Sequence, residues 1–206
     1  MANILIIESS ANLSGSTSRQ LTQEFVDKLS EKSDQHTFIY RDLVKQPIDI
    51  LNDTTVAIIR TKPEELTNEQ RQATQLSETL ISELKAADAV VIGSAMYNWN
   101  ISASLKAWLD QVMRIGFTFG YGEKGLVGLL NNKPTLAILS RGGNYDSPER
   151  AAVDMQKPYL ANVLAIMGLD VSFATMEGAL MPEEARSKNL AKTRAAIDDF
   201  IEKISQ

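Results

Sequence analysis

The chain has no cysteine and only one histidine, His36, among its 206 residues. Disulfide bonds, thiol catalysis and zinc sites made from cysteine and histidine are therefore excluded. A serine–histidine–aspartate triad would need His36, which precedes a short strand predicted near the edge of the sheet. We interpret His36 as a surface residue, so the sequence predicts neither a catalytic nucleophile nor a metal site.

Basic residues and long apolar runs are also scarce. The 21 lysines and arginines are outnumbered by 26 aspartates and glutamates, which gives a net charge of −5. This balance argues against nucleic acid or an anionic membrane as the main partner. No apolar run approaches the roughly 18 residues of a membrane-spanning helix. The N-terminal segment lacks the basic region and the apolar length of a signal peptide, so we expect a cytoplasmic protein.

Neither linkers nor repeats nor low-complexity tracts interrupt the chain, so we expect residues 1–206 to form a single domain. Apolar runs predict strands at 4–7, 37–40, 89–92, 135–139 and 171–175. Helical spacing of apolar residues predicts helices at about 18–31, 67–85, 101–115, 148–167 (interrupted at Pro158) and 183–204. A short helix is favoured over a strand at 56–59.

Strands that alternate with helices indicate an α/β fold in three layers, with a parallel sheet in the middle. The expected strand order is 2-1-3-4-5, the flavodoxin-like order, with a ligand crevice between strands one and three. Three loops follow strands one, three and four. Because the carboxyl ends of neighbouring parallel strands share one edge, these loops should meet there.

The first loop, residues 9–18, is crowded with hydroxyl groups at the start of a helix. Hydroxyls and free backbone N–H groups at a helix start suit a phosphate group. An ordinary helix cap would use the same residues, so the loop alone does not decide between the two interpretations.

The other two loops are residues 96–100 and 140–143. Aromatic rings, a thioether and an amide in the Met-Tyr-Asn-Trp segment suit a flat heterocycle, although core aromatics with a capping Asn would look the same. The paired glycines of Ser-Arg-Gly-Gly allow backbone N–H groups to approach a ligand, and Arg141 could offset negative charge. A plain turn is the alternative for this loop.

The connection 116–133 is unusually long and carries the aromatic run 117–121. A loop of this length in a compact domain is commonly functional. We expect it to be a lid or a subunit contact, with a minor core over the sheet as the alternative.

Taken together, these motifs resemble a known family. Met-Tyr-Asn-Trp-Asn-Ile-Ser at 96–102, Leu105-Lys106 with Asp110, and Ser-Arg-Gly-Gly at 140–143 look like the FMN-dependent NADH-azoreductases, also described as FMN-dependent NADH:quinone oxidoreductases. The likeness covers nearly the whole chain. It implies a flavodoxin-like homodimer with one FMN per subunit, near the subunit interface, and NADH as co-substrate.

The resemblance also implies site residues, by matched position. The FMN phosphate would be held by Ser10, Ser16, Thr17 and Ser18. The isoalloxazine would contact Met96, Tyr97, Asn98 and Trp99, and its pyrimidine side would contact Ser140, Arg141, Gly142 and Gly143. Phe119 and Tyr121 would lie around the substrate. Trp99 stands where Phe is common, and residues 144–157 form a longer segment than in some relatives, which concerns the acceptor range more than the cofactor site.

The implied reaction has two half-reactions, in which NADH passes a hydride to flavin N5 and reduced flavin then reduces a quinone or an aromatic azo compound. No catalytic side chain is predicted, because the flavin carries the chemistry. A flavodoxin-type electron carrier without NADH turnover is the alternative. The long chain and the aromatic loop favour the enzyme.

Overall fold

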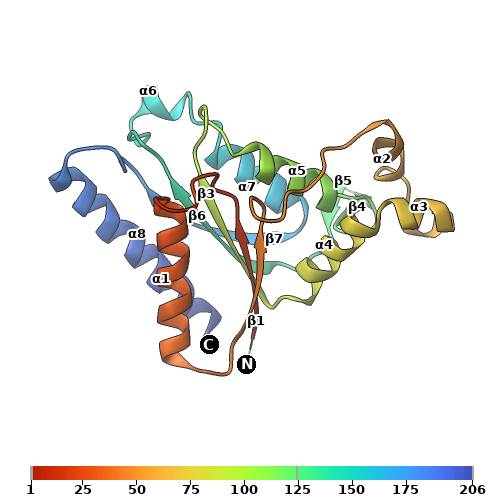
Figure 1. The fold of residues 1–206 in the computed structure, drawn as a ribbon, viewed down its shortest axis with the longest axis horizontal. Helices are drawn as coiled ribbons and strands as arrows, with labels where there is room; N and C mark the ends of the chain where they lie inside the picture. Colours follow the sequence, from red (N-terminus) through yellow and green to blue (C-terminus); the bar gives the residue numbers. More distant parts are fainter. Residues whose placement is uncertain (1, 124, 206) are drawn as a thin grey trace.

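The computed structural model of the chain describes residues 2–123 and 125–205. Its main sheet has five parallel strands in the order β2-β1-β3-β6-β7 (Figure 1). The strands are β1 (Asn3–Glu8), β2 (Thr37–Asp42), β3 (Ala89–Ala95), β6 (Lys133–Ser140) and β7 (Leu169–Met176). All five predicted strands are present, and their order becomes the predicted 2-1-3-4-5 when the strands of the main sheet alone are counted.

Helices cover both faces of the sheet, which gives three layers (Figure 1). α1 and α8 pack on one face, and α4, α5 and α7 pack on the other. Along β1, Ile4 and Ile6 face the first group while Leu5 and Ile7 face the second, which is why the central strands are continuous apolar runs. The bounds are α1 (Thr17–Lys32), α4 (Gln75–Ala86), α5 (Ala103–Val112), α6 (Pro148–Ala151), α7 (Lys157–Ile166) and α8 (Glu183–Ile204).

α8 is 22 residues long and lies against α1, where the Phe25 and Phe200 ring centroids are 6.2 Å apart. Ion pairs between the two helices join Lys28 to Asp198, Lys32 to Glu202 and Glu24 to Arg194. Charged side chains on the outer face therefore accompany the apolar contact on the inner face. Within residues 2–123 and 125–205, no helix combines the length and the apolar character needed to cross a membrane.

The helix predicted from residue 67 to about 85 is interrupted, so that prediction was wrong in one respect. It forms two helices, α3 (Asn68–Ala73) and α4. A capping box starts α3, in which the Thr67 and Gln70 side chains each accept the other's backbone N–H. At the break, the Thr74 hydroxyl donates to the Gln70 carbonyl at 3.0 Å. Such a bond to the preceding turn bends helices.

Two other helix boundaries follow from local hydrogen bonds or from proline. α5 ends at Val112 rather than Ile115, because the Thr118 hydroxyl donates to the Val112 carbonyl at 2.6 Å and accepts from the Arg114 N–H at 3.1 Å. The predicted interruption near Pro158 separates α6 from α7, and this proline lies in the first turn of α7, where its missing N–H has no helical partner to lose. The short helix favoured at 56–59 is α2 (Asp53–Ile58), and a single 3₁₀ turn, η1 (Pro63–Glu65), follows it.

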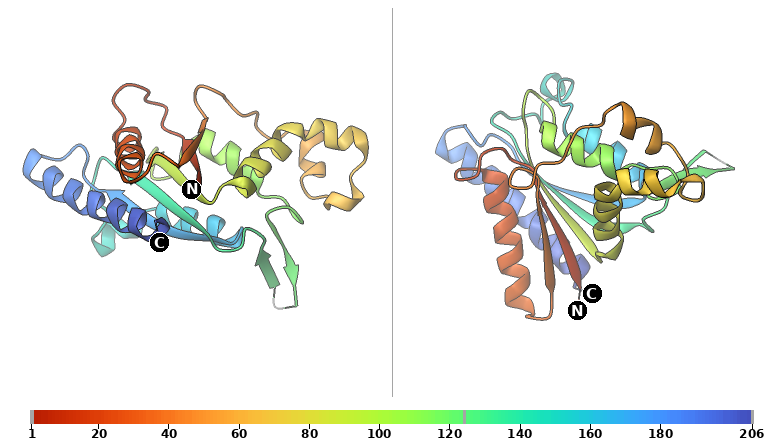
Figure 2. Two further views of the ribbon diagram at one scale, coloured as in Figure 1. Left: turned by 90° about the horizontal axis from the view of Figure 1, so that it is seen from below. Right: turned by 45° about the vertical axis from the view of Figure 1, so that its right-hand side comes forward.

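The long connection 116–133, expected as a loop, contains an antiparallel hairpin of β4 (Phe119–Gly122) and β5 (Gly125–Gly128). The hairpin projects away from the main sheet (Figure 2). Gly128 anchors it, since a Cβ added there would lie 2.2 Å from the backbone nitrogen of Gly168. The backbones approach so closely that neither position has room for a side chain.

Candidate functional site

A cleft of about 190 Å³ opens at the carboxyl edge of the main sheet. Segments that follow β1, β3 and β6 line it together, at the point where the strand order reverses. The structure brings eight of the expected cofactor residues to this cleft: Ser10, Ser16, Thr17, Met96, Tyr97, Ser140, Arg141 and Gly142. The expected residues Ser18, Asn98, Trp99 and Gly143 follow these in the chain and lie outside its lining.

The first loop presents the start of α1 to the cleft. Ser16 caps the helix by accepting the Arg19 N–H at 3.4 Å, and its hydroxyl lies 3.0 Å from that of Ser18. Asn12 orders the turn before it, because its side-chain oxygen accepts the N–H groups of Ser14 and Gly15. The first N–H groups of a helix have no preceding turn to bond, so this end of α1 offers donors and a positive dipole to an anion.

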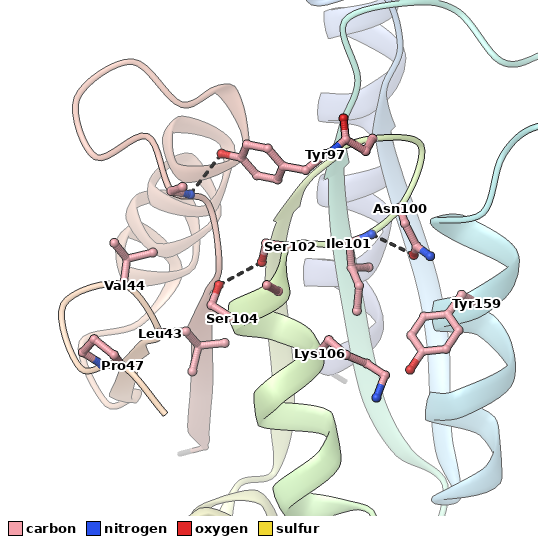
Figure 3. A pocket seen from close by; sticks show the side chains of 13 residues that line it. Leu43, Val44, Pro47, Tyr97, Asn100, Ile101, Ser102, Ser104, Lys106 and Tyr159 are labelled. Carbon is pink, nitrogen blue, oxygen red and sulfur yellow. Dashed lines mark hydrogen bonds between the residues drawn. The ribbon is translucent and has the colours of Figure 1, made fainter. Parts of the chain in front are cut away.

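Tyr97 joins the first loop to the second. Its hydroxyl accepts the Ala11 N–H at 3.0 Å (Figure 3). It also lies 3.2 Å from the Ser10 hydroxyl. This side chain therefore fixes the distance between two loops that are 86 residues apart in the chain. Its ring, and not its hydroxyl, is left for contact with a ligand.

The second loop is a tight two-residue turn. Tyr97 and Asn100 exchange backbone hydrogen bonds of 2.8 and 3.0 Å, while Asn98 and Trp99 both have positive φ, 47° and 65°. Asn tolerates this conformation, but for a bulky residue such as Trp it is strained by roughly 1–3 kcal/mol. The turn leaves Trp99 at the surface, where 54% of the residue is exposed.

The third loop is held in place by Arg141. Its guanidinium turns inward and is almost fully buried, with Nη1 3.0 Å from Glu177 Oε1 and Nη2 2.9 Å from Asp154 Oδ2. Its Nε also donates to Gln156 Oε1 at 3.2 Å. Two carboxylates already balance this charge, which leaves little of it to offset negative charge on a ligand. Arg141 instead ties the third loop to β7 and to the segment before α7.

A fourth segment, residues 177–180, completes the cleft, and the sequence analysis did not assign it. Its backbone N–H groups bond the third loop: Gly178 to the Gly143 carbonyl at 2.8 Å, and Leu180 to the Gly142 carbonyl at 3.2 Å. Leu180 and Ala179 line the cleft. The segment follows β7, the strand next to β6, so the rule that located the other three loops could have located this one.

Two carboxyl groups behind the first loop have displaced pKa values. Burial raises the pKa of Glu8, the last residue of β1, to about 7. Arg19 lowers the pKa of Asp42 to about 2, through a bond of 2.7 Å from Nη1 to Oδ2. Neither carboxyl group was among the residues predicted to form the site. For Glu8, the sequence does contain one indication of a displaced pKa. Its carboxyl group ends an apolar strand and is therefore flanked by buried elements.

Comparison with known proteins shows the family to which the chain belongs. Residues 2–201 match a family model described as the flavodoxin-like fold. The chain is 41% identical over 202 residues to the FMN-dependent NADH:quinone oxidoreductase of Herminiimonas arsenicoxydans, and the alignment covers 98% of this chain and 99% of the relative. The chain belongs to the FMN-dependent NADH:quinone oxidoreductase family. The family predicted from the sequence is thereby confirmed.

A second member of the FMN-dependent NADH:quinone oxidoreductase family, from Trichormus variabilis, is 42% identical over 200 residues, which cover 96% of this chain and 97% of that protein. Among solved structures, an FMN-dependent NADH-azoreductase from Bacillus anthracis in complex with FMN has a TM-score of 0.85 at 23% identity and covers all of both chains. An azoreductase from another strain of that organism has a TM-score of 0.83 at 24% identity over 98% of each chain. These structures share the fold of this family member.

Beside the cleft, this member of the FMN-dependent NADH:quinone oxidoreductase family has a larger cavity of about 810 Å³ (Figure 3). Leu43 and Pro47 lie on one side of it and Tyr159 of α7 on the other, with Ile101 and the start of α5 between them. Tyr97 lines both the cleft and this cavity. Apolar walls with a few polar groups suit a flat organic molecule.

Phe119 and Tyr121, expected around the substrate, are not brought to either of these cavities. They line a third one with Ile59, Arg60 and Met113, under the hairpin. Tyr121 is 73% exposed. Within one chain of this family member, the structure therefore separates the two aromatic residues from the three loops.

Proposed function

We propose that the chain is an FMN-dependent NADH oxidoreductase that reduces quinones by two electrons, and aromatic azo compounds as well, in two half-reactions at one site. The observation that carries the proposal is the cleft in which three loops meet, with Tyr97 bonded across it. We further propose that residues 1–206 act as one FMN-binding domain and assemble as a homodimer. A cytoplasmic location fits the proposal, because reduced nicotinamide is kept inside the cell.

The residues at one end of the cleft can be compared with the donors that the phosphate of FMN needs. The phosphate is assigned to the start of α1, with Ser10, Ser16, Thr17 and Ser18. The hydroxyl pair of Ser16 and Ser18 and the free N–H groups of the first turn match the donors that a phosphate needs. Arg19 is already engaged by Asp42, so backbone donors, hydroxyls and the helix dipole hold the phosphate.

The flavin ring is assigned to the other side of the cleft. Met96, Tyr97, Asn98 and Trp99 would pack on it and hydrogen-bond its edge, while Ser140, Gly142 and Gly143 would face its pyrimidine side. Within the described residues, no hydrogen bond uses the backbone N–H of Gly142 or Gly143, so both remain available as donors. Arg141 keeps its place in the assignment only as the anchor of this loop. We add Ala179 and Leu180, which complete the cleft wall.

When bound, FMN supplies the hydride chemistry of the reaction. The chain's residues position the reactants and stabilise charge. The free N–H groups at Gly142 and Gly143 would stabilise negative charge at the pyrimidine side of the flavin. Donors that are already in position stabilise developing charge most effectively. The cavity of about 810 Å³ beside Tyr97 is assigned to the nicotinamide and, after it leaves, to the acceptor. No side-chain acid or base is assigned.

In the proposed homodimer, Phe119 and Tyr121 would act on substrate bound to the other copy. What supports this is that Tyr121 is exposed and lines a cavity separate from the chain's own cleft. The hairpin that carries it projects from the main sheet (Figure 2). A Tyr121→Ala change should then raise the KM for the acceptor and leave FMN content unchanged.

The proposal is tested with purified protein under anaerobic conditions. It should carry a flavin absorbance band that bleaches when NADH is added and returns when a quinone is added. Tyr97→Phe, which removes the bond between the loops, should weaken FMN binding about tenfold, since a hydrogen bond of this kind contributes about 1 kcal/mol or more. Tyr121→Phe, at an exposed tyrosine of the hairpin, is the matched control.

A colourless protein that takes up no added FMN would contradict the proposal. A protein that binds FMN but consumes no NADH with a quinone would instead be an electron carrier, the alternative from the sequence. Comparing initial rates with NADH and NADPH over quinone and azo acceptors would define the substrates.

A further inference from the structure

Glu8 is a buried acid that the proposed reaction does not use. It ends β1 on the face covered by α1, and only 9% of the residue is exposed. Its Oε2 has no hydrogen-bond partner among the residues that the structure describes. A buried carboxyl oxygen without a partner is costly, so its position needs a reason.

The carboxyl group occupies space that only glycine leaves open on the neighbouring strand. A Cβ added to Gly93 of β3 would lie 2.7 Å from Glu8 Oε2 and 2.8 Å from Thr22 Oγ1. The Thr22 hydroxyl in turn donates to the Ser18 carbonyl in the first turn of α1 at 2.9 Å. Glu8 therefore lies directly beneath the helix turns to which the proposed function assigns the phosphate.

The cation that could neutralise Glu8 is held elsewhere. Arg19 of α1 pairs with Asp42 of β2, and its Nε and Nη2 donate to the Ser10 carbonyl at 3.2 and 2.9 Å. In the described parts of the chain, no basic group forms an ion pair with Glu8. The other titratable groups that face Glu8 are Lys45 and the phenol of Tyr40. Lys45 forms an ion pair with Asp42, with Nζ 3.9 Å from Oδ2. Burial outweighs the attraction of Arg19 and raises the pKa of Glu8 to about 7.

We propose that Glu8 is a positioning residue which makes loading of a phosphate-bearing flavin depend on a proton: the phosphate binds when Glu8 is protonated, and ionised Glu8 opposes it. The inference rests on the proposed function. An ionised carboxylate beneath the helix start would repel the phosphate and cancel part of the helix dipole. By linkage, binding of the phosphate must then draw a proton onto Glu8.

The expected sign follows from this linkage. Above about pH 7 the free phosphate is already ionised, since its second pKa is about 6. Any further pH dependence therefore comes from the protein. The FMN dissociation constant should rise with pH as Glu8 ionises in the free protein, by several-fold between pH 7 and 8.5 and by at most about tenfold per pH unit for one proton. Riboflavin, which lacks the phosphate, should bind with little dependence on pH.

The experiment titrates the full chain, freed of flavin, with FMN and with riboflavin between pH 6.5 and 8.5 and follows flavin fluorescence. Calorimetry in two buffers of different ionisation enthalpy counts protons. Uptake of a fraction of a proton, rising toward one above pH 8, is expected with FMN only. Glu8→Gln should flatten the FMN curve, while Glu24→Gln, an acid-to-amide change on the outer side of α1, should leave it unchanged.

Equal pH slopes for the unmodified chain and Glu8→Gln would overturn the inference. So would an equal slope for FMN and riboflavin on the unmodified chain, a comparison that does not require the variant to fold. Failure of the chain to bind FMN at any pH is a different result, because it would remove the proposed function itself and the role of Glu8 with it.

Discussion

Two buried glutamates lie at the carboxyl edge of the sheet, and their surroundings differ. Glu177, which follows β7, has Oε1 3.0 Å from Arg141 Nη1, and its Oε2 accepts the Tyr145 N–H at 2.9 Å. Glu8, which ends β1, has one oxygen without a partner in the described structure and a would-be cation, Arg19, that is bound to Asp42. Burial raises the pKa of both groups.

The two glutamates show that burial alone does not decide whether a carboxyl group is structural or can change its protonation state. Each oxygen of Glu177 has a partner, and this buried ion-pair network fixes the geometry of a loop. Glu8 lacks such compensation, so its protonation state is open to change near neutral pH. The first group is structural, and the second is able to respond to a ligand.

The largest expected effect comes from breaking the buried ion-pair network of Arg141. Arg141→Met should leave Glu177 and Asp154 buried without their cation and should lower the free energy of unfolding by about 3–5 kcal/mol. Urea denaturation at pH 7 measures this. The control is Arg186→Met, which removes only an exposed pair with Glu183 on α8 and should cost less than about 1 kcal/mol. Similar losses in the two variants would mean that the buried network adds nothing special.

The second test concerns the unpartnered acid. The folded-state pKa of Glu8, about 7, lies above its ordinary value of 4.5. The folded protein therefore holds a proton that the unfolded chain releases, and the resulting stability is present below pH 4.5 and lost as pH rises through 7. Glu8→Gln should gain roughly 3 kcal/mol relative to the unmodified chain between pH 4.5 and 8. Denaturation curves at the two pH values would show it, and parallel stability–pH profiles would contradict it.

A smaller effect should follow from freeing Arg19. Asp42→Asn removes its partner, which should cost about 2 kcal/mol at pH 7. The pKa of Asp42 is lowered from 3.8 to about 2 in the folded protein. The stability that this ion pair contributes is therefore present above pH 3.8 and is lost as the pH falls toward 2. The same change removes a negative charge near Glu8, so the pKa of Glu8 should fall. Carbon-13 NMR titration of the Glu8 carboxyl would follow this, and an unchanged Glu8 titration would show that Asp42 does not influence it.

The smallest effect provides the baseline. Arg194 of α8 bonds Glu24 of α1 through Nε and Nη2, both at 2.8 Å, on the exposed outer side of the two helices. Arg194→Gln should cost about 0.5 kcal/mol at low ionic strength and almost nothing in 1 M salt, since exposed pairs are screened. A loss as large as that of Arg141→Met would erase the distinction between buried and exposed ion pairs.

The main sheet could be predicted because its physics is local and repetitive. Each strand is an apolar run and each crossover helix has its own spacing, so alternation predicts the parallel sheet. The hairpin of β4 and β5 escaped prediction because its strands are only four residues long and contain glycine, which gives no periodic signal. The break at Thr74 depends on one side-chain hydroxyl, which helical spacing does not reveal.

The candidate site could be predicted as far as its loops, because parallel strands bring their carboxyl ends to one edge. The direction of the Arg141 side chain could not, because it depends on Glu177, which is 36 residues away, and on Asp154. Glu8 was missed for a similar reason. The space that it fills is created by an absent side chain on another strand, at Gly93.

That space at Gly93 has an evolutionary consequence. Any larger residue at position 93 would collide with both Glu8 Oε2 and Thr22 Oγ1, so alanine on β3 would need smaller or displaced side chains at positions 8 and 22. Positions 8 and 93 should therefore covary among descendants of this protein. In a lineage that acquires a side chain at position 93, the glutamate at position 8 should have been replaced first.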